Sequence, residues 1–210
     1  MNRSSQEAFW AGSFGDDYSL RNKEEGIIAS NIALFSQILA RTSKVKSIME
    51  FGANIGLNLV AINKLLPKAD FSAVEINESA CKSLEELGFV KVYCKSIFEF
   101  EIDRKRDFTF SKGVLIHTNP SILNKAYEIL YNTSKRYICI CEYYNPTPLE
   151  VTYRGYDGKL FKRDFSGEMM ERFPDLKLID YGFVYHRDPC FPQDDVTWFL
   201  MEKGGMRKID

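Results

Sequence analysis

The stretch "IMEFGANIGLNLV", residues 48–60, leads from an apolar run through a glycine-containing turn into a helical pattern. Gly52 and Gly56 stand four residues apart, with Asn54 between them. Glycine permits sharp bends and close approach, and asparagine is one of the few other residues that tolerate left-handed dihedrals. In open α/β sheets such a turn, at the carboxyl end of a strand, is where ligands bind.

Strand and helix patterns alternate around this turn. Strands are expected at 47–50, 70–76, 89–97, 107–116 and 136–144, and helices at 24–41, 57–66, 77–87 and 119–132. Asn77 is the expected N-cap of the third of these helices, and Gly88 closes it. This alternation predicts a mostly parallel sheet with helices on both faces.

The C-terminal part breaks the alternation. Residues 176–187 and 195–203 are strand-like, and the loop between them is too short for a crossover helix. Two strands joined in this way form an antiparallel pair. The predicted fold class is therefore α/β and Rossmann-like, with a seven-stranded, mostly parallel sheet that ends in an antiparallel hairpin.

The composition is that of an ordinary globular protein. The 210 residues predict a single domain, with an N-terminal helical arm or lid at 1–45 and a core at 46–204 that carries an insert at about 145–165. A net charge of −1 gives no basic field, so no nucleic-acid partner is expected. No apolar run approaches the roughly 20 residues of a membrane span, and the N-terminus lacks the apolar stretch of a signal peptide.

Five cysteines occur, without CxxC spacing. Cys139 and Cys141 lie two apart in a strand-like run and should share a face. We expect buried free thiols, with a metal pair as the less favoured alternative. Free thiols are typical of a reducing cytoplasm, which is the predicted location.

The turn discriminates between two nucleotide-binding patterns. A dinucleotide fingerprint beginning at Gly52 would require glycine at 54 and 57, where the chain has Asn54 and Leu57. The turn instead resembles that of class I S-adenosylmethionine-dependent methyltransferases, [D/E]-x-G-x-G-x-G, which Glu50, Gly52 and Gly56 match. Asn54 is the single departure. The resemblance implies S-adenosyl-L-methionine as cofactor, with the turn close to its methionine part.

An acidic residue follows at the expected place. Glu75 ends the second strand, 23 residues after Gly52, and a carboxylate there can accept both ribose hydroxyls. Both nucleotide-binding families use this device, and a solvated carboxylate is the alternative. The methyltransferase resemblance further implies that Ile76 flanks the adenine and that Ser96 and Ile97 contact its amino edge and face, where the family often has Asp.

Three longer stretches narrow the resemblance. They are "QEAFWAGSFGDDYSLRN" (6–22), "EFGANIGLN" (50–58) and "FVYHRDPCFPQDDVTWFLMEK" (183–203). They are similar to the pseudaminic acid biosynthesis-associated methylases over most of the chain. The resemblance implies methyl transfer to a small-molecule acceptor, a nonulosonic (pseudaminic) acid-related sugar or its nucleotide-activated form, in surface-glycan biosynthesis.

Three residues are candidates for catalysis. His117 follows the fourth strand and could act as a base near neutral pH, cap the helix that begins near Asn119, or only line the pocket. Glu142 ends the fifth strand and could orient an acceptor or pair with a basic residue. His186 lies in the loop of the terminal hairpin among aspartates that could face the acceptor or simply favour a turn; a metal site is the weaker alternative, and no metal is expected.

The N-terminal segment is rich in aromatic residues, Trp10 among them, and continues to Arg21. It could form a lid in which Trp10 and Arg21 contact the cofactor, or an arm packed on the core. Ser111, in the fourth strand, completes the predicted cofactor-binding set. The insert at 145–165 could shape a pocket for an anionic acceptor or be an exposed charged loop.

Two other functions compete with methyl transfer. An NAD-dependent oxidoreductase is disfavoured by the failed dinucleotide spacing and by the lack of a second domain. A methyltransferase-like protein that only binds its ligand stays open, because Glu50, Gly52 and Glu75 would persist after loss of the acceptor site.

Overall fold

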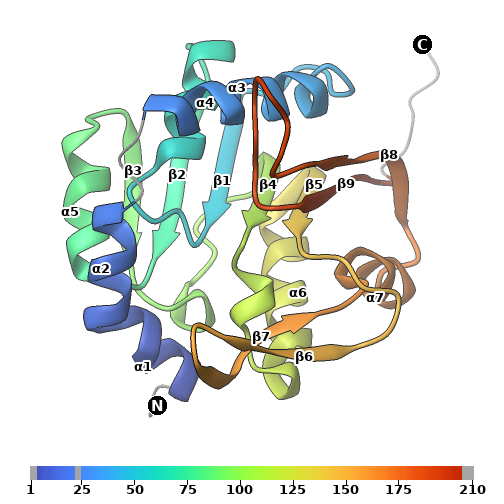
Figure 1. The fold of residues 1–210 in the computed structure, drawn as a ribbon. Helices are drawn as coiled ribbons and strands as arrows, with labels where there is room; N and C mark the ends of the chain where they lie inside the picture. The colour runs from blue at the N-terminus through green and yellow to red at the C-terminus, as the bar shows by residue number, and fades with distance from the viewer. Residues whose placement is uncertain (1–3, 22–24, 205–210) are drawn as a thin grey trace.

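The computed structural model describes residues 4–21 and 25–204 (Figure 1). Two short helices, α1 (Ser5–Ala11) and α2 (Ser13–Arg21), precede the longer α3 (Glu25–Leu39). The elements that follow are, in chain order, β1 (Ser47–Phe51), α4 (Leu57–Leu65), β2 (Asp70–Glu75), α5 (Glu78–Glu86), β3 (Val90–Cys94), β4 (Arg106–Lys112), α6 (Leu123–Thr133), β5 (Ser134–Glu142), β6 (Leu149–Tyr153), β7 (Tyr156–Lys162), α7 (Phe165–Arg172), β8 (Leu176–Val184) and β9 (Val196–Lys203).

The main sheet has the strand order β3-β2-β1-β4-β5-β9-β8. Strands β1 to β5 are parallel to one another, whereas β9 runs antiparallel to both β5 and β8. The predicted seven-stranded α/β sheet with its terminal hairpin is thus confirmed. The strand order reverses between β1 and β4, so the crevice at their carboxyl ends is the expected ligand site.

Strand periodicity divides the core between the two faces of the sheet. Ile48 packs in the cluster that contains Phe35 of α3, and its neighbour Met49 packs in the cluster that contains Leu130 of α6 and Met169 of α7. Successive side chains of a strand point to opposite faces. As Figure 1 shows, the sheet is a central layer between helices.

Three predicted strands end three or more residues earlier than expected, and one of them, predicted at 176–187, stops at Val184. The strand predicted at 107–116 stops at Lys112, because Gly113 (φ 69°) turns the chain into a 3₁₀ turn at Leu115–His117. The strand predicted at 89–97 stops at Cys94, where another turn begins. The caps of α5 are as predicted: the Asn77 side chain accepts a hydrogen bond from the Ala80 nitrogen, and Gly88 (φ 72°) follows the helix.

The insert at 145–165 is not an irregular loop, although many of its residues are exposed as one alternative expected. Strands β6 and β7 form an antiparallel hairpin in which Tyr153 and Tyr156 flank a two-residue turn. The turn residues Arg154 (φ 50°) and Gly155 (φ 84°) both have positive φ, which matches the twist that favours two-residue hairpins. A further helix, α7, follows and is capped by Asp164.

The expectation of free thiols is wrong for one pair of cysteines. Cys81 of α5 and Cys94 of β3 form a disulfide with their Cα atoms 5.8 Å apart, a distance that suits the bond. The packing of α5 beside the end of β3 brings them together, which their spacing in sequence did not indicate. Cys139 and Cys141 are free and buried as expected, and Cys190 is free but exposed.

Candidate active site

The turn after β1 has the left-handed backbone that its sequence predicts. Gly52 (φ 74°), Asn54 (φ 49°) and Gly56 (φ 83°) all have positive φ. Asn54 therefore occupies the conformation usually given to glycine. A Cβ at Gly52 would overlap the Val114 side chain, so this glycine lets the turns after β1 and β4 approach closely.

Glu75 joins this turn to the end of β2. Its Oε2 accepts a hydrogen bond from the Asn54 nitrogen at 2.7 Å, and its Oε1 accepts from the nitrogens of Ile76 and Asn77, both at 2.8 Å. Burial raises the pKa of Glu75, while these backbone donors oppose the rise. The carboxylate is thereby fixed in orientation at the wall of a cavity.

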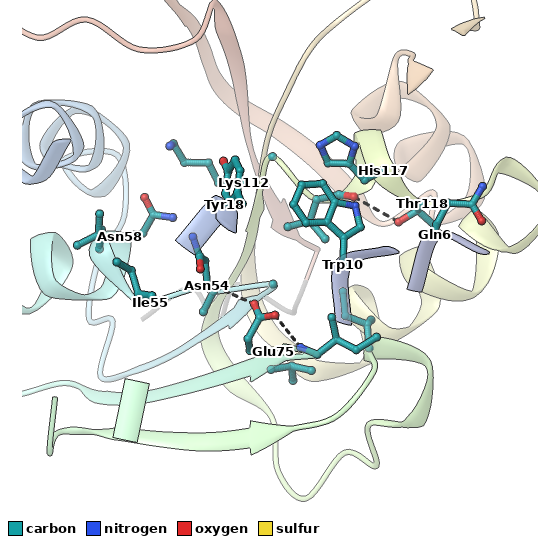
Figure 2. A pocket seen from close by; sticks show the side chains of 18 of the residues that line it. Gln6, Trp10, Tyr18, Asn54, Ile55, Asn58, Glu75, Lys112, His117 and Thr118 are labelled. Carbon is teal, nitrogen blue, oxygen red and sulfur yellow. Dashed lines mark hydrogen bonds between the residues drawn. The ribbon is translucent and has the colours of Figure 1, made fainter. Parts of the chain in front are cut away.

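The cavity has a volume of about 350 Å³, within the range of small-molecule sites. Its wall includes many predicted cofactor-binding residues: Trp10, Gly52, Asn54, Glu75, Ile76, Ser96 and Ile97. Figure 2 shows Asn54 and Glu75 side by side in this wall, with Trp10 and His117 facing one another at another part of it. Residues from the turn after β1, from β2, from the loop after β3 and from the N-terminal arm therefore meet at one cavity.

Glu50 lies behind the turn and does not line the cavity. It is fully buried, and its Oε1 accepts a hydrogen bond from Asn58 Nδ2 at 2.6 Å. Its Oε2 has no hydrogen-bond partner among the described residues. Burial raises the pKa of Glu50 to about 8, against the opposing effects of Asn58 and of the Lys112 charge. The side chain is therefore protonated at neutral pH.

The N-terminal arm covers the cavity and packs on the β6–β7 hairpin. Gln6 Nε2 donates to the Gly158 carbonyl at 3.0 Å, and the rings of Phe9 and Tyr156 lie 5.1 Å apart. Trp10 lines the cavity, and its buried Nε1 lacks a partner among the described residues. The side chain of Arg21, which was predicted to contact the cofactor, lies outside the part of the chain that the structure describes.

His117 lines the cavity between two aromatic rings. Its ring centroid lies 4.6 Å from that of Trp10 and 4.9 Å from that of Tyr153. Its Nδ1 lies 2.5 Å from the Lys159 carbonyl oxygen, which can only accept, so Nδ1 carries the proton and Nε2 keeps a lone pair. Burial lowers the pKa of His117 to about 4. Asn119, not His117, caps the following 3₁₀ turn.

Glu142 and Ser111 lie beneath the cavity rather than in its wall. Glu142 Oε1 accepts hydrogen bonds from Ser111 Oγ and from the nitrogens of Val114 and Leu115, each at 3.0 Å. Burial raises the pKa of Glu142 to about 7. This carboxyl group thus organises the turn that carries His117.

His186 lies apart from the other candidates. It borders a second, more open groove of about 530 Å³, together with Tyr143 and Lys162. Its Nδ1 is 2.9 Å from Asp195. The two cavities share Asp194 as a lining residue. No group of three or more potential metal ligands occurs among residues 4–21 and 25–204.

Several lining residues were not predicted from the sequence. They are Gln6, Glu7, Tyr18, Asn31, Asn58, Lys112 and Gln193. For Glu7 a signal existed, since Ser4 and Glu7 have the spacing of a capping box, which the structure forms. Nothing in the local sequence relates α1 to the loop after β3.

The sequence matches no protein-family model and no curated protein. Solved structures with the same fold are numerous. The Burkholderia thailandensis 1,6-didemethyltoxoflavin-N1-methyltransferase, with bound S-adenosylhomocysteine, has a TM-score of 0.69 at 12% identity over 95% of this chain and 87% of its own. The Synechocystis magnesium protoporphyrin IX methyltransferase, with bound SAM, has a TM-score of 0.70 at 10% identity over 97% and 100% of the two chains.

The plantazolicin methyltransferase BpumL, solved with SAH, is similar at a TM-score of 0.66 and 14% identity, over 96% of this chain and 95% of its own. Identities this low show the shared fold of these methyltransferases and do not identify an acceptor. Within the described residues, none of the helices combines the length and apolarity that a membrane crossing needs.

Proposed function

We propose that the protein is an S-adenosyl-L-methionine-dependent methyltransferase acting on a small molecule, with the whole chain working as one domain. The observation that carries this proposal is the hydrogen bond between Glu75 and the Asn54 nitrogen in the cavity wall. This hydrogen bond joins the left-handed turn to a carboxylate that is placed as ribose-binding carboxylates are, at the point where the strand order reverses.

The residues present fit the cofactor. Glu75 would hold the ribose hydroxyls, Ile76 and Ile97 offer apolar walls for a base, and the turn at 52–56 leaves room for the methionine part. The buried Oε2 of Glu50, which has no hydrogen-bond partner among the described residues, lies behind that turn and outside the cavity wall. When bound, the cofactor supplies an electrophilic methyl group, so the chain's own task is to position the acceptor and manage its proton.

His117 is the residue we assign to the acceptor proton. Its neutral ring keeps one lone pair at Nε2, because the Lys159 carbonyl holds the proton at Nδ1. Glu142 supports this arrangement from beneath by holding the backbone of residues 114–116. His186, in the neighbouring groove, would contact a distal part of the acceptor rather than the reacting atom.

The proposed acceptor is a nonulosonic (pseudaminic) acid-related sugar. The sequence resemblance of the two chain ends supports it, and Lys112 in the cavity wall offers a positive charge for a carboxylate. We also propose a cytoplasmic location, which the three free cysteines favour and the Cys81–Cys94 disulfide opposes. Cell fractionation tests the location.

Calorimetry with S-adenosylmethionine, S-adenosylhomocysteine and NAD tests the cofactor. We expect binding of the first two and none of NAD; a preference for NAD would end the proposal. Mass spectrometry of products from a panel of acidic sugars, their nucleotide-activated forms and neutral sugars then tests the acceptor. Cofactor binding without methylation of any sugar in the panel would refute the sugar assignment.

A further inference from the structure

Glu7 stands where the cavity meets the loop after β3. Its Oε2 accepts a hydrogen bond from the Ser4 nitrogen at 2.8 Å, which fixes the carboxylate at the start of α1. Its Oε1 accepts from Ser96 Oγ, which belongs to that loop. Glu7, Ser96 and Ile97 all line the cavity. A carboxylate from the N-terminal helix thus reaches a loop 89 residues away along the chain.

The side chains of the loop after β3 offer little hydrogen-bond acceptor capacity to an amino group of a ligand. Ser96 Oγ accepts a hydrogen bond from the Phe98 nitrogen at 3.1 Å and directs its own proton to Glu7. No acidic side chain of the loop lines the cavity at this place. The strongest hydrogen-bond acceptor in the cavity wall near Ser96 is therefore Glu7, whose carboxylate has about four acceptor positions.

The register of strands β2 and β3 indicates where the base of a bound nucleoside would lie. Glu75 and Cys94 are register partners of β2 and β3, so Ser96 lies just beyond the strand next to Glu75. A nucleoside whose ribose is held at Glu75 would extend between Ile76 and Ile97 toward Ser96 and Glu7. The exocyclic amino group of adenine is a donor, and a carboxylate is its complement.

We propose that Glu7 of the N-terminal helix accepts a hydrogen bond from the exocyclic amine of the cofactor's adenine and sets the specificity for that base. This rests on the proposed function. The arm is tied to the ribose side as well, since Asn77 Nδ2 donates to Asp16 Oδ1 of α2 at 2.9 Å. The arm is accordingly part of the nucleoside site and not only its cover.

The experiment compares two nucleosides that differ at one position. S-adenosylhomocysteine has a 6-amino group, which can donate a hydrogen bond to the Glu7 carboxylate. S-inosylhomocysteine has a 6-oxo group at the same position, which is an acceptor and would repel that carboxylate. Affinities of both are measured by calorimetry for the full chain and for Glu7→Ala and Glu7→Gln. Asp17→Ala is the matched control, because it removes an exposed acid from the same arm.

The wild type should prefer the adenosyl compound by at least about tenfold, since charge-assisted hydrogen bonds discriminate strongly. Glu7→Ala should reduce that preference to about threefold or less, chiefly by weakening S-adenosylhomocysteine, while Asp17→Ala keeps it. Glu7→Gln retains a residue suited to the third helical position and should show an intermediate preference, which decides the question if Glu7→Ala does not fold.

An unchanged preference in both Glu7 variants, or the absence of a preference in the wild type, would overturn the role of Glu7 and leave the methyltransferase proposal standing. Failure of the wild type to bind S-adenosylhomocysteine or S-adenosylmethionine at all would instead overturn the proposed function, and this inference with it.

Discussion

The carboxylate of Glu75 lies 2.7 Å from the backbone nitrogen of Asn54, so the end of β2 and the turn after β1 form one hydrogen-bonded unit. Of the remaining donors to Glu75, both come from its own turn, Ile76 and Asn77. This arrangement orients the carboxylate toward the cavity before any ligand arrives. Preorganisation of this kind reduces the entropic cost of binding.

Glu75→Ala should weaken binding of S-adenosylhomocysteine by about 100-fold, because loss of charge-assisted hydrogen bonds to two hydroxyls costs on the order of 3 kcal/mol. Calorimetry measures the affinity. Asp70→Asn, at the exposed opposite end of the same strand, is the control and should leave it unchanged. Equal affinities for wild type and Glu75→Ala would remove the assigned role.

Asn54→Gly should be close to neutral for stability, whereas Asn54→Val should cost about 2 kcal/mol. Asn54 has φ 49°, a region open to glycine and strained for a β-branched residue. Urea unfolding curves measure both free energies of unfolding. A Val variant as stable as the Gly variant would show that the turn relaxes out of the left-handed region.

The buried imidazole of His117 should make the protein less stable as the pH falls from 6.5 to 4. Its pKa in the folded state is about 4, below the ordinary value of the free side chain. The unfolded chain therefore binds more protons between pH 6.5 and 4, and the free energy of unfolding decreases as the pH decreases. The difference corresponds to about 3 kcal/mol. In His117→Gln this part of the pH dependence should vanish, as measured by thermal unfolding between pH 4 and 7.

The same residue makes a separate kinetic prediction. If Nε2 of His117 takes the acceptor proton, His117→Ala should keep cofactor affinity and slow methyl transfer about 100-fold or more. The wild-type rate should show no inflection near pH 6.5 that originates from His117, because its pKa is lower. Full activity of His117→Ala would exclude it as the base.

Glu50→Gln should remove a pH dependence of stability whose sign is opposite to that of His117. The pKa of Glu50 is raised to about 8, so its contribution is present below pH 4.5 and is lost as the pH rises through 8. Over that range the wild type loses about 5 kcal/mol of stability, and the neutral amide should avoid this loss. Melting temperatures at pH 5, 7 and 9 measure this; Glu101→Gln, at an exposed position, serves as control.

Glu142→Gln should destabilise the protein by about 2 to 3 kcal/mol. The carboxylate accepts hydrogen bonds from four donors, and an amide would present its own N–H to some of them, leaving buried groups unpaired. The control is Glu202→Gln, because the ion-pair partner of Glu202, Arg136, is half exposed. This substitution should change the free energy of unfolding by no more than about 0.5 kcal/mol. Chemical denaturation measures both.

The sequence determined most of the fold through local signals. Apolar periodicity located the strands and helices, and the short loop before β9 required an antiparallel pair. The glycines at 52 and 56, with Asn54, specified the left-handed turn, and Asn77 specified a cap. Each of these signals acts within a few residues, where backbone dihedrals and side-chain direction are set by neighbouring atoms.

Packing between distant segments decided which side chains face the cavity. Glu50 and Glu142 turn inward and hold the turns in place, His186 lies at a separate groove, and Glu7 reaches Ser96 across the sheet edge. The position of a side chain at a strand end does not fix whether it points into the site or beneath it. That direction follows from long-range contacts, such as the one between His117 and the Lys159 carbonyl, which only the assembled structure contains.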